Sequence, residues 1–161
     1  MQARSVSRIW IRAVPMMIVW GLLGTVSSAW GQTTSGACSD QILRGDYGFI
    51  IQGWVHPADG VSVPLFGVAM TNFDGDGKLT QVDHVIAGGD PISPTQWTPA
   101  TGTYHVNYDC TGTAQITVAS TGLVVNLRIV VVRHGEEVRF VVTPPFSGPK
   151  FTVTSIGTRR H

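Results

Sequence analysis

Helical periodicity is what this sequence lacks most. Beyond residue 31, no long segment repeats its apolar side chains about every 3.6 residues, which argues against a helical bundle or a fold of alternating helices and strands. The chain holds 19 glycines and 9 prolines, and apolar residues alternate with polar ones along much of it. That alternation is typical of strands. The predicted fold class is therefore all-β.

Charge and catalytic motifs are also scarce. Charged residues make up 13% of the chain, with 11 basic against 10 acidic side chains, so no basic face for nucleic acid is predicted. No Gly-x-Ser-x-Gly nucleophile elbow and no glycine-rich phosphate loop occurs. The only glutamates, Glu136 and Glu137, are adjacent, and neighbours on a strand point to opposite faces, so they cannot work as an acid and base pair. We assign no catalytic residue.

Only two cysteines are present, Cys38 and Cys110. Disulfides persist in exported proteins, and the N-terminal segment described next predicts export, so a bridge between the two is the favoured interpretation. Two free thiols or a metal-binding pair are the alternatives, although no Cys-x-x-Cys spacing supports either.

Residues 1–31 have the pattern of a signal peptide. Arg4, Arg8 and Arg12 precede an apolar run and then a stretch of small residues, which is the order of a secretory signal. The apolar run is shorter than the roughly 20 residues that a membrane span needs, so a retained anchor is the less favoured alternative. We predict a secreted or periplasmic protein that leaves the membrane once the signal is cleaved, with residues 32–161 forming a single domain.

Alternation with period 2 predicts eight strands with mostly short connections, each with one apolar face. Such strands suit a single antiparallel up-and-down barrel, in which the last strand pairs with the first and no edge stays open. A two-sheet β-sandwich is the alternative. Residues 39–43 are expected to form a helical turn capped by Ser39 or Asp40, and residues 88–101 a loop at the rim. The predicted strands are 46–55, 62–73, 78–87, 102–109, 113–119, 123–133, 136–144 and 150–157.

Two hairpins predict their own register. A turn at His134-Gly135 places Val131 opposite Val138 and continues in apolar pairs along one face. A turn at residues 74–78 places Val68 opposite His84. We expect the apolar set of this second hairpin to face inward, and with it His84. The residues expected inside are Tyr47, Phe49, Ile51, Phe66, Val68, Met70, Val82, His84, Ile86, Tyr104, Val106, Tyr108, Ala114, Ile116, Val118, Leu127, Ile129, Val131, Val138, Phe140, Val142, Phe151 and Val153.

Three motifs carry a family resemblance: Cys-Ser-x3-Leu-x-Gly-x-Tyr-Gly-Phe from Cys38, Phe-Asp-Gly-x-Gly-x-Leu from Phe73, and Gly-Thr-Tyr-x-Val-x2-Asp-Cys-x-Gly from Gly102. With these motifs the chain resembles a family of small exported bacterial β-barrel proteins. The resemblance implies a small antiparallel barrel, similar in outline to the allene oxide cyclase and calycin barrels. It implies no particular substrate. The chain departs from the pattern in its longer segment 88–101.

No metal site or cofactor is predicted. Asp74 and Asp76 resemble the start of a calcium loop, but Lys78 and Val85 stand where further ligands would be needed, so a plain hairpin turn is favoured. The five histidines are not spaced as ligands of one metal. Single tryptophans such as Trp97 are more often packing residues than platforms for a sugar or a partner.

The candidate ligand-binding residues are an inward His84 and three tyrosines. An imidazole and phenols inside an apolar barrel could orient a polar group of a ligand or move a proton. A core histidine with satisfied ring nitrogens is the plainer interpretation. The tyrosines are Tyr47, Tyr104 and Tyr108.

Two functions follow as hypotheses. The first is a non-enzymatic barrel that binds a small apolar ligand or a surface partner, although large inward residues such as Phe49 and Phe140 favour a filled interior. The second, an isomerase or cyclase like allene oxide cyclase, rests on fold analogy and on His84 with the tyrosines.

Overall fold

The computed structural model describes residues 37–58, 60–94, 96–146 and 149–161. The predicted signal peptide lies outside them and stays a prediction. No helix within the described residues is long and apolar enough to cross a membrane. The elements in this part of the chain are the 3-10 helices η1 (Asp40–Ile42) and η2 (Arg133–Gly135) and the strands β1 (Arg44–His56), β2 (Val63–Asp74), β3 (Lys78–Ala87), β4 (Asp90–Pro91), β5 (Thr98–Val106), β6 (Thr111–Val118), β7 (Val124–Val132), β8 (Glu137–Thr143) and β9 (Lys150–Arg159).

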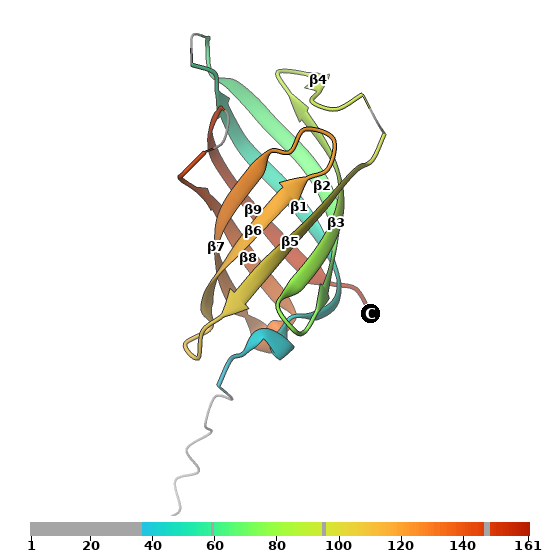
Figure 1. The fold of residues 1–161 in the computed structure, drawn as a ribbon, viewed down its shortest axis with the longest axis vertical. Helices are drawn as coiled ribbons and strands as arrows, with labels where there is room; N and C mark the ends of the chain where they lie inside the picture. Colours follow the sequence, from blue (N-terminus) through green and yellow to red (C-terminus); the bar gives the residue numbers. More distant parts are fainter. Residues whose placement is uncertain (1–36, 59, 95, 147–148) are drawn as a thin grey trace, which may run out of the picture. The chain divides into compact units, whose positions relative to one another are not determined.

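Eight of the strands form a closed antiparallel barrel (Figure 1). Each pairs with the next along the chain, except that β3 pairs with β5, and β9 returns to β1. The closing pair runs in register from Tyr47 opposite Arg159 to His56 opposite Lys150. The up-and-down barrel predicted from the sequence is confirmed, and the sandwich is excluded. Closure leaves no long unpaired edge that could pair with another chain.

The expected rim loop 88–101 is more ordered than the sequence suggested. Asp90 and Pro91 form β4, which pairs only with the end of β3, and β5 already begins at Thr98. Prolines favoured the loop interpretation, yet Pro99 lies within β5 and points outward, where it is exposed. Only the middle of this segment therefore bridges the strands.

Both predicted hairpin registers are correct. Val131 lies opposite Val138, and Val68 lies opposite His84. The face predicted for the second hairpin is wrong: Phe66, Val68 and Val82 are 53%, 48% and 40% exposed on the outside. Since side chains alternate along a strand, an error in the inward face of one residue reverses the predicted face of every residue in that strand.

The neighbouring strand explains why this face was misjudged. Tyr47 of β1, which is fully buried, lies opposite Thr71 of β2, which is also fully buried. Phe73 and Leu79, at the β2–β3 turn, are buried too. Odd-numbered residues of β2 and β3 therefore face inward, although the even-numbered set is the more apolar.

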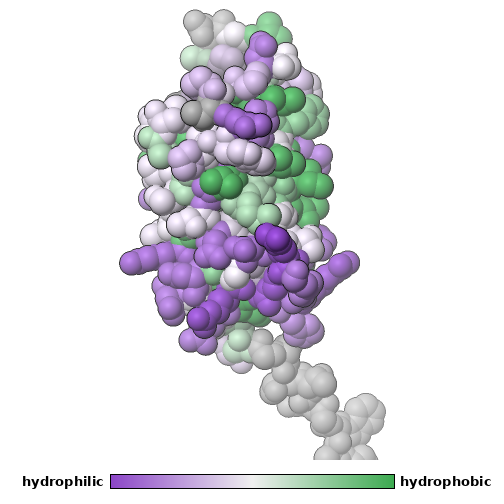
Figure 2. All heavy atoms as spheres, turned by 90° about the vertical axis from the view of Figure 1, so that its right-hand side faces the viewer, coloured by the Kyte–Doolittle hydropathy of each residue, from purple (hydrophilic) through white to green (hydrophobic). Residues whose placement is uncertain are grey.

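The outward apolar residues form a patch over several strands. Ile50 lies opposite Ile156 on β9 and opposite Val68 on β2, and all three side chains are exposed. Figure 2, which looks at the right-hand side of Figure 1, shows apolar surface at mid-height and hydrophilic residues gathered toward the lower end, where η1 lies.

The end of the barrel that carries η1 is closed by packed side chains. The ring of Phe73 packs edge-on against Tyr47 and Tyr104, with centroids 5.2 and 5.0 Å apart. The predicted helical turn is present as η1, but Ser39 makes no side-chain capping bond. The carboxylate of Asp40 instead accepts a 2.6 Å hydrogen bond from the backbone N–H of Val106, which attaches η1 to the barrel wall.

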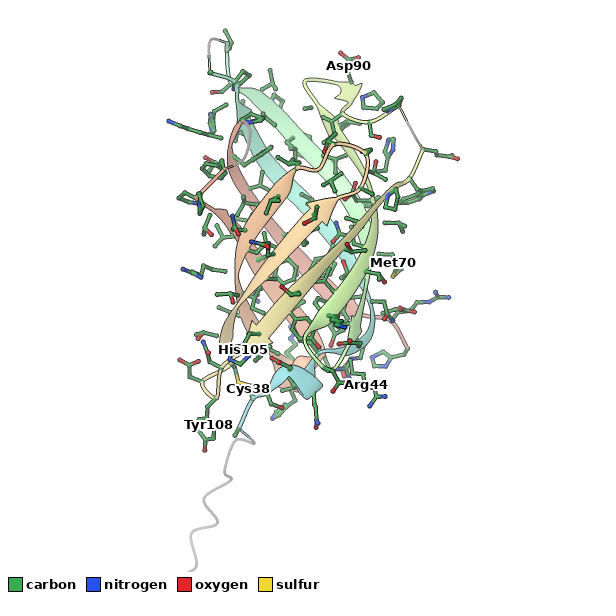
Figure 3. The ribbon with its side chains drawn as sticks, in the orientation of Figure 1. Cys38, Arg44, Met70, Asp90, His105 and Tyr108 are labelled. Atoms are coloured by element: carbon green, nitrogen blue, oxygen red, sulfur yellow. A yellow bond between two sulfur atoms is a disulfide. The ribbon has the colours of Figure 1, made fainter. Side chains whose placement is uncertain are left out.

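The predicted disulfide between Cys38 and Cys110 is present, with the two Cα atoms 5.0 Å apart. It ties the segment before η1 to the β5–β6 turn. Disulfides of this kind are typical of proteins that fold in oxidising compartments outside the cytoplasm. Figure 3 shows Cys38 and Tyr108 at this closed end and Asp90 at the opposite end.

Candidate functional site

The other half of the barrel is hollow. A cavity of about 520 Å³ is lined by residues toward the end opposite η1, where it opens between the segments around Ile92 and Leu123. Inward-facing residues from all eight barrel strands line it, for example Val55 of β1 and Val142 of β8. The expectation of a wholly filled interior is therefore wrong, because the large side chains that fill the barrel gather at its closed end.

Two stacked rings form the floor of the cavity. Phe49 and Phe140 have ring centroids 4.8 Å apart at an interplanar angle of 25°, and both line the cavity. Gly157, opposite Phe49 on β9, leaves the space that the Phe49 ring occupies, because a Cβ atom there would overlap the ring. The position of the Phe49 ring in the floor thus depends on a glycine at this position.

Above the floor the walls are mainly aliphatic, although Thr98 and Ser155 also line them. Small and medium-sized side chains such as Val85, Ala87 and Val118 reach the interior but do not meet across it. The rim is formed by the segment after β4, around Ile92, and by the β6–β7 connection, around Leu123. Apolar walls of this kind favour an apolar occupant over water.

A chain of three polar side chains interrupts the apolar wall on β2 and β3. The hydroxyl of Thr71, which is fully buried, donates a 2.8 Å hydrogen bond to Oε1 of Gln81. Nε2 of Gln81 in turn donates a 2.9 Å bond to Oδ2 of Asp83. Gln81 and Asp83 line the cavity. The chain starts in the packed half of the barrel and ends at a carboxylate in the hollow half.

The surroundings of Asp83 disfavour the ionised form of its carboxyl group. Burial raises its pKa, and the hydrogen bond from Gln81 and the nearby His84 oppose that rise only in part. Its partners on the flanking strands are Ala69 on β2 and Thr98 on β5, neither of which is titratable. A half-buried carboxyl with a raised pKa inside a cavity is a common mark of a functional site.

His84, expected inside, lies on the outer face. Its Nδ1 is 2.9 Å from the backbone oxygen of Gln96, and its ring packs edge-on against Trp97 at 6.4 Å between centroids. Trp97 is itself 50% exposed. The interior histidine required by the isomerase hypothesis is therefore absent from the described residues.

The three predicted tyrosines do not join His84 or line the cavity. Tyr108 is 79% exposed, because β5 ends at Val106 and Tyr108 lies in the turn that follows. Tyr47 donates a hydrogen bond to the backbone oxygen of Gly135, and the hydroxyl of Tyr104 lies 2.9 Å from the backbone oxygen of Leu43.

The environment of Tyr104 favours a structural role. Its hydroxyl also accepts a 2.9 Å hydrogen bond from the backbone N–H of Gly75. Burial raises the pKa of Tyr104 to about 12, and the carboxylates of Asp74 and Asp40 add to the rise against the hydrogen bonds that lower it. The phenol therefore stays protonated at ordinary pH and holds the β2–β3 turn against η1.

The Asp74-Gly75-Asp76-Gly77 segment forms the plain hairpin turn that the sequence favoured. Oδ1 of Asp74 accepts hydrogen bonds from the backbone N–H groups of Asp76 and Lys78, at 2.7 and 2.9 Å. These bonds hold the pKa of Asp74 below its usual value. No group of three or more potential metal-binding side chains occurs in the part of the chain that the structure describes.

The sequence interpretation missed Gln81 and Asp83, which line the cavity. Both stood in the correct register, on the face taken to be solvent-exposed. The apolar residues Phe73 and Leu79 beside the turn were the sequence signal for this face, because the strand period places Gln81 and Asp83 on the same side as Leu79. Comparisons with protein-family models, curated proteins and solved structures found no match.

Proposed function

We propose that this protein binds a small, largely apolar molecule in the hollow half of its barrel and holds it away from water, without catalysing a reaction. The main observation in favour of this proposal is the cavity of about 520 Å³, which is open at one end. Pockets for small molecules usually measure about 300–1,000 Å³, and eight-stranded barrels are wide enough to hold one such ligand.

The contrast between the two ends of the barrel supports this function. The closed end is sealed by side chains such as Phe73 and Leu43, which are almost fully buried. The open end keeps a hollow that further large side chains could have filled. A hollow lined by aliphatic groups forfeits packing energy, and an apolar occupant would restore it.

Apolar contact alone can supply useful affinity. Each buried methylene is worth about 0.8 kcal/mol, so a ligand with about ten of them gains roughly 8 kcal/mol before the costs of association. We further propose that binding takes place outside the cytoplasm, as the disulfide between Cys38 and Cys110 supports.

A fluorescent probe tests the proposal. The neutral dye N-phenylnaphthylamine brightens in apolar surroundings, and we expect it to bind the purified protein in a saturable way with one site per chain. Native mass spectrometry of protein from its own host then asks whether a natural ligand copurifies. Failure of the dye and of a series of long-chain alcohols to bind would overturn the proposal.

A matched pair of variants locates the binding site. Val85 of β3 lines the cavity, whereas Val82 of the same strand is 40% exposed on the outside. Val85→Trp places an indole in the cavity and should weaken dye binding strongly. Val82→Trp should leave it unchanged. An effect of Val82→Trp alone would place the dye on the outer apolar patch and contradict the proposal. Equal effects of the two variants would also contradict it, because the dye would then not depend on the cavity.

A further inference from the structure

We propose that the preferred occupant of the cavity is an amphipathic molecule whose head group donates hydrogen bonds, a primary amine above all, and that Asp83 receives this head group. The inference rests on the proposed function and specifies the chemistry of the ligand. Two observations support this inference: the direction of the hydrogen bonds that end at Asp83, and the charges around the cavity.

The direction of the hydrogen bonds sets what a ligand must bring. The Thr71 hydroxyl donates to Gln81, and the Gln81 amide donates to Asp83. Each donor in this chain points toward Asp83, so the chain ends in carboxylate oxygens that accept. An ionised carboxylate is an acceptor only, with room for several hydrogen bonds. A donor from the ligand fits there, whereas a further acceptor does not.

The charges point to the same ligand class. Among the described residues that line the cavity, Asp83 is the only ionisable one. The nearest basic side chain, His84, lies on the outer face. An anionic head group would therefore meet a carboxylate with no cation inside the cavity to offset the repulsion. An ammonium group would instead pair with Asp83 and offset the cost of burying its charge.

The position of Asp83 along the barrel suits a head group that follows an apolar tail. Phe49 and Phe140 form the apolar floor below. Asp83 lies on β3 between Gln81, one residue pair closer to the closed end, and Val85 and Ala87 toward the rim. A tail can lie against the opposite wall, around Val125 of β7 and Val142 of β8, while the head group reaches Asp83.

Ligands of equal tail length provide the test. Decylamine, decanol and decanoic acid are each titrated against bound N-phenylnaphthylamine at neutral pH, below their micelle concentrations. We expect decylamine to displace the dye at about tenfold lower concentration than decanol, because a charge-assisted hydrogen bond is roughly twice as strong as a neutral one. Decanoic acid should be the weakest of the three.

Two variants distinguish a specific effect of the Asp83 carboxylate from a general effect of negative charge at this end of the barrel. Asp83→Asn keeps the shape of the side chain and should bring decylamine and decanol to within about threefold of each other. Asp90→Asn removes an exposed carboxylate at the same end of the barrel and should keep the preference for the amine. Circular dichroism and thermal unfolding establish that each variant is folded.

The outcomes distinguish the two proposals. If the dye and decanol bind but decanoic acid binds as tightly as decylamine, the assignment of the ligand class is wrong and the binding function stands. A preference for the amine that survives in Asp83→Asn also overturns the assignment. If no probe binds to the wild-type protein, both proposals fall.

Discussion

The hydroxyl of Tyr47 accepts hydrogen bonds from two nitrogens of Arg159, Nε at 3.0 Å and Nη2 at 2.8 Å, although 112 residues separate them in sequence. The same hydroxyl donates to the backbone oxygen of Gly135. The Arg159 side chain continues to the backbone oxygen of Ile42 at 2.7 Å. The Tyr47 hydroxyl thus connects the first strand with the last strand and the β7–β8 turn, and Arg159 extends this network to η1. Tyr47 therefore helps to close this end of the barrel.

Removal of the Tyr47 hydroxyl should destabilise the barrel without abolishing ligand binding in the cavity. Tyr47→Phe leaves the oxygen of Gly135 without its donor and removes one acceptor of the Arg159 guanidinium, which keeps its bond to Ile42. Hydrogen bonds to charged groups are worth about 1.5–3 kcal/mol, and we expect the free energy of unfolding in urea to fall by about that amount. N-phenylnaphthylamine should still bind, because Tyr47 does not line the cavity.

Tyr108→Phe is the matched control. Tyr108 is 79% exposed, so loss of its hydroxyl should change the stability by no more than about 0.5 kcal/mol. If Tyr47→Phe abolished dye binding at unchanged stability, the sequence-based assignment of Tyr47 to a ligand site would be right and the seal interpretation wrong.

Loss of the disulfide should lower the unfolding midpoint. The bond between Cys38 and Cys110 spans 72 residues, and the chain-entropy estimate for a loop of this length is about 4 kcal/mol at most. The Cys38→Ser/Cys110→Ser double variant and the wild-type protein in reducing agent should both melt at the same, lower temperature. An unchanged midpoint in both would mean that the bond contributes nothing to stability.

A methyl group at Gly157 should disturb the floor of the cavity. A Cβ atom there would overlap the ring of Phe49, which is stacked on Phe140 and has little space to move. Overpacking of this kind costs about 1–3 kcal/mol. We expect Gly157→Ala to lower the stability by that amount, measured by urea unfolding, and to change dye affinity as well.

Gly48 provides the control for this substitution. It lies on β1 beside Phe49, and a Cβ atom added to it would meet nothing within 4 Å. Gly48→Ala should therefore be neutral or slightly stabilising, because it restricts the unfolded chain. A similar loss in both variants would mean that strand conformation, rather than the Phe49 ring, is responsible.

The barrel itself could be predicted because local patterns determine it. Alternation and turn residues located all eight barrel strands, and the turns fixed both hairpin registers, such as Val131 opposite Val138. On β2 and β3 most of the apolar pattern indicated the wrong face, and only Phe73 and Leu79 beside the turn indicated the right one. Their outer set, with Phe66 and Val82, is more apolar than their inner set, and the face was decided by pairing with Tyr47 across β1.

The cavity could not be predicted for a related reason. Whether a barrel is filled depends on how side chains meet across the interior, which no spacing along one strand records. Phe49 and Phe140 were correctly expected inside, but they stack on each other and close one half of the barrel instead of filling both. Asp83 became a candidate only once the cavity was known.

The contribution of Asp83 to the stability of the barrel should fall as the pH rises, which is the opposite of the usual behaviour of an aspartate in a folded protein. Burial raises the pKa of Asp83 in the folded state above its unfolded value, which is about 3.9 for an aspartate. Between these two values the folded chain holds more protons than the unfolded chain, so the contribution of Asp83 to stability falls as the pH rises through that window. Above it, the folded protein carries a poorly solvated charge.

Asp83→Asn should therefore be more thermostable than the wild-type protein at pH 7, and this advantage should vanish as the pH falls below about 4. Asp74 provides a control of opposite sign. Hydrogen bonds from Lys78 and Asp76 hold its pKa below the usual value, so Asp74→Asn should lose stability at neutral pH and approach the wild type in acid. Melting curves across this range measure both. A constant difference between Asp83→Asn and the wild type at every pH would show that Asp83 ionises normally and that its burial does not oppose its charge.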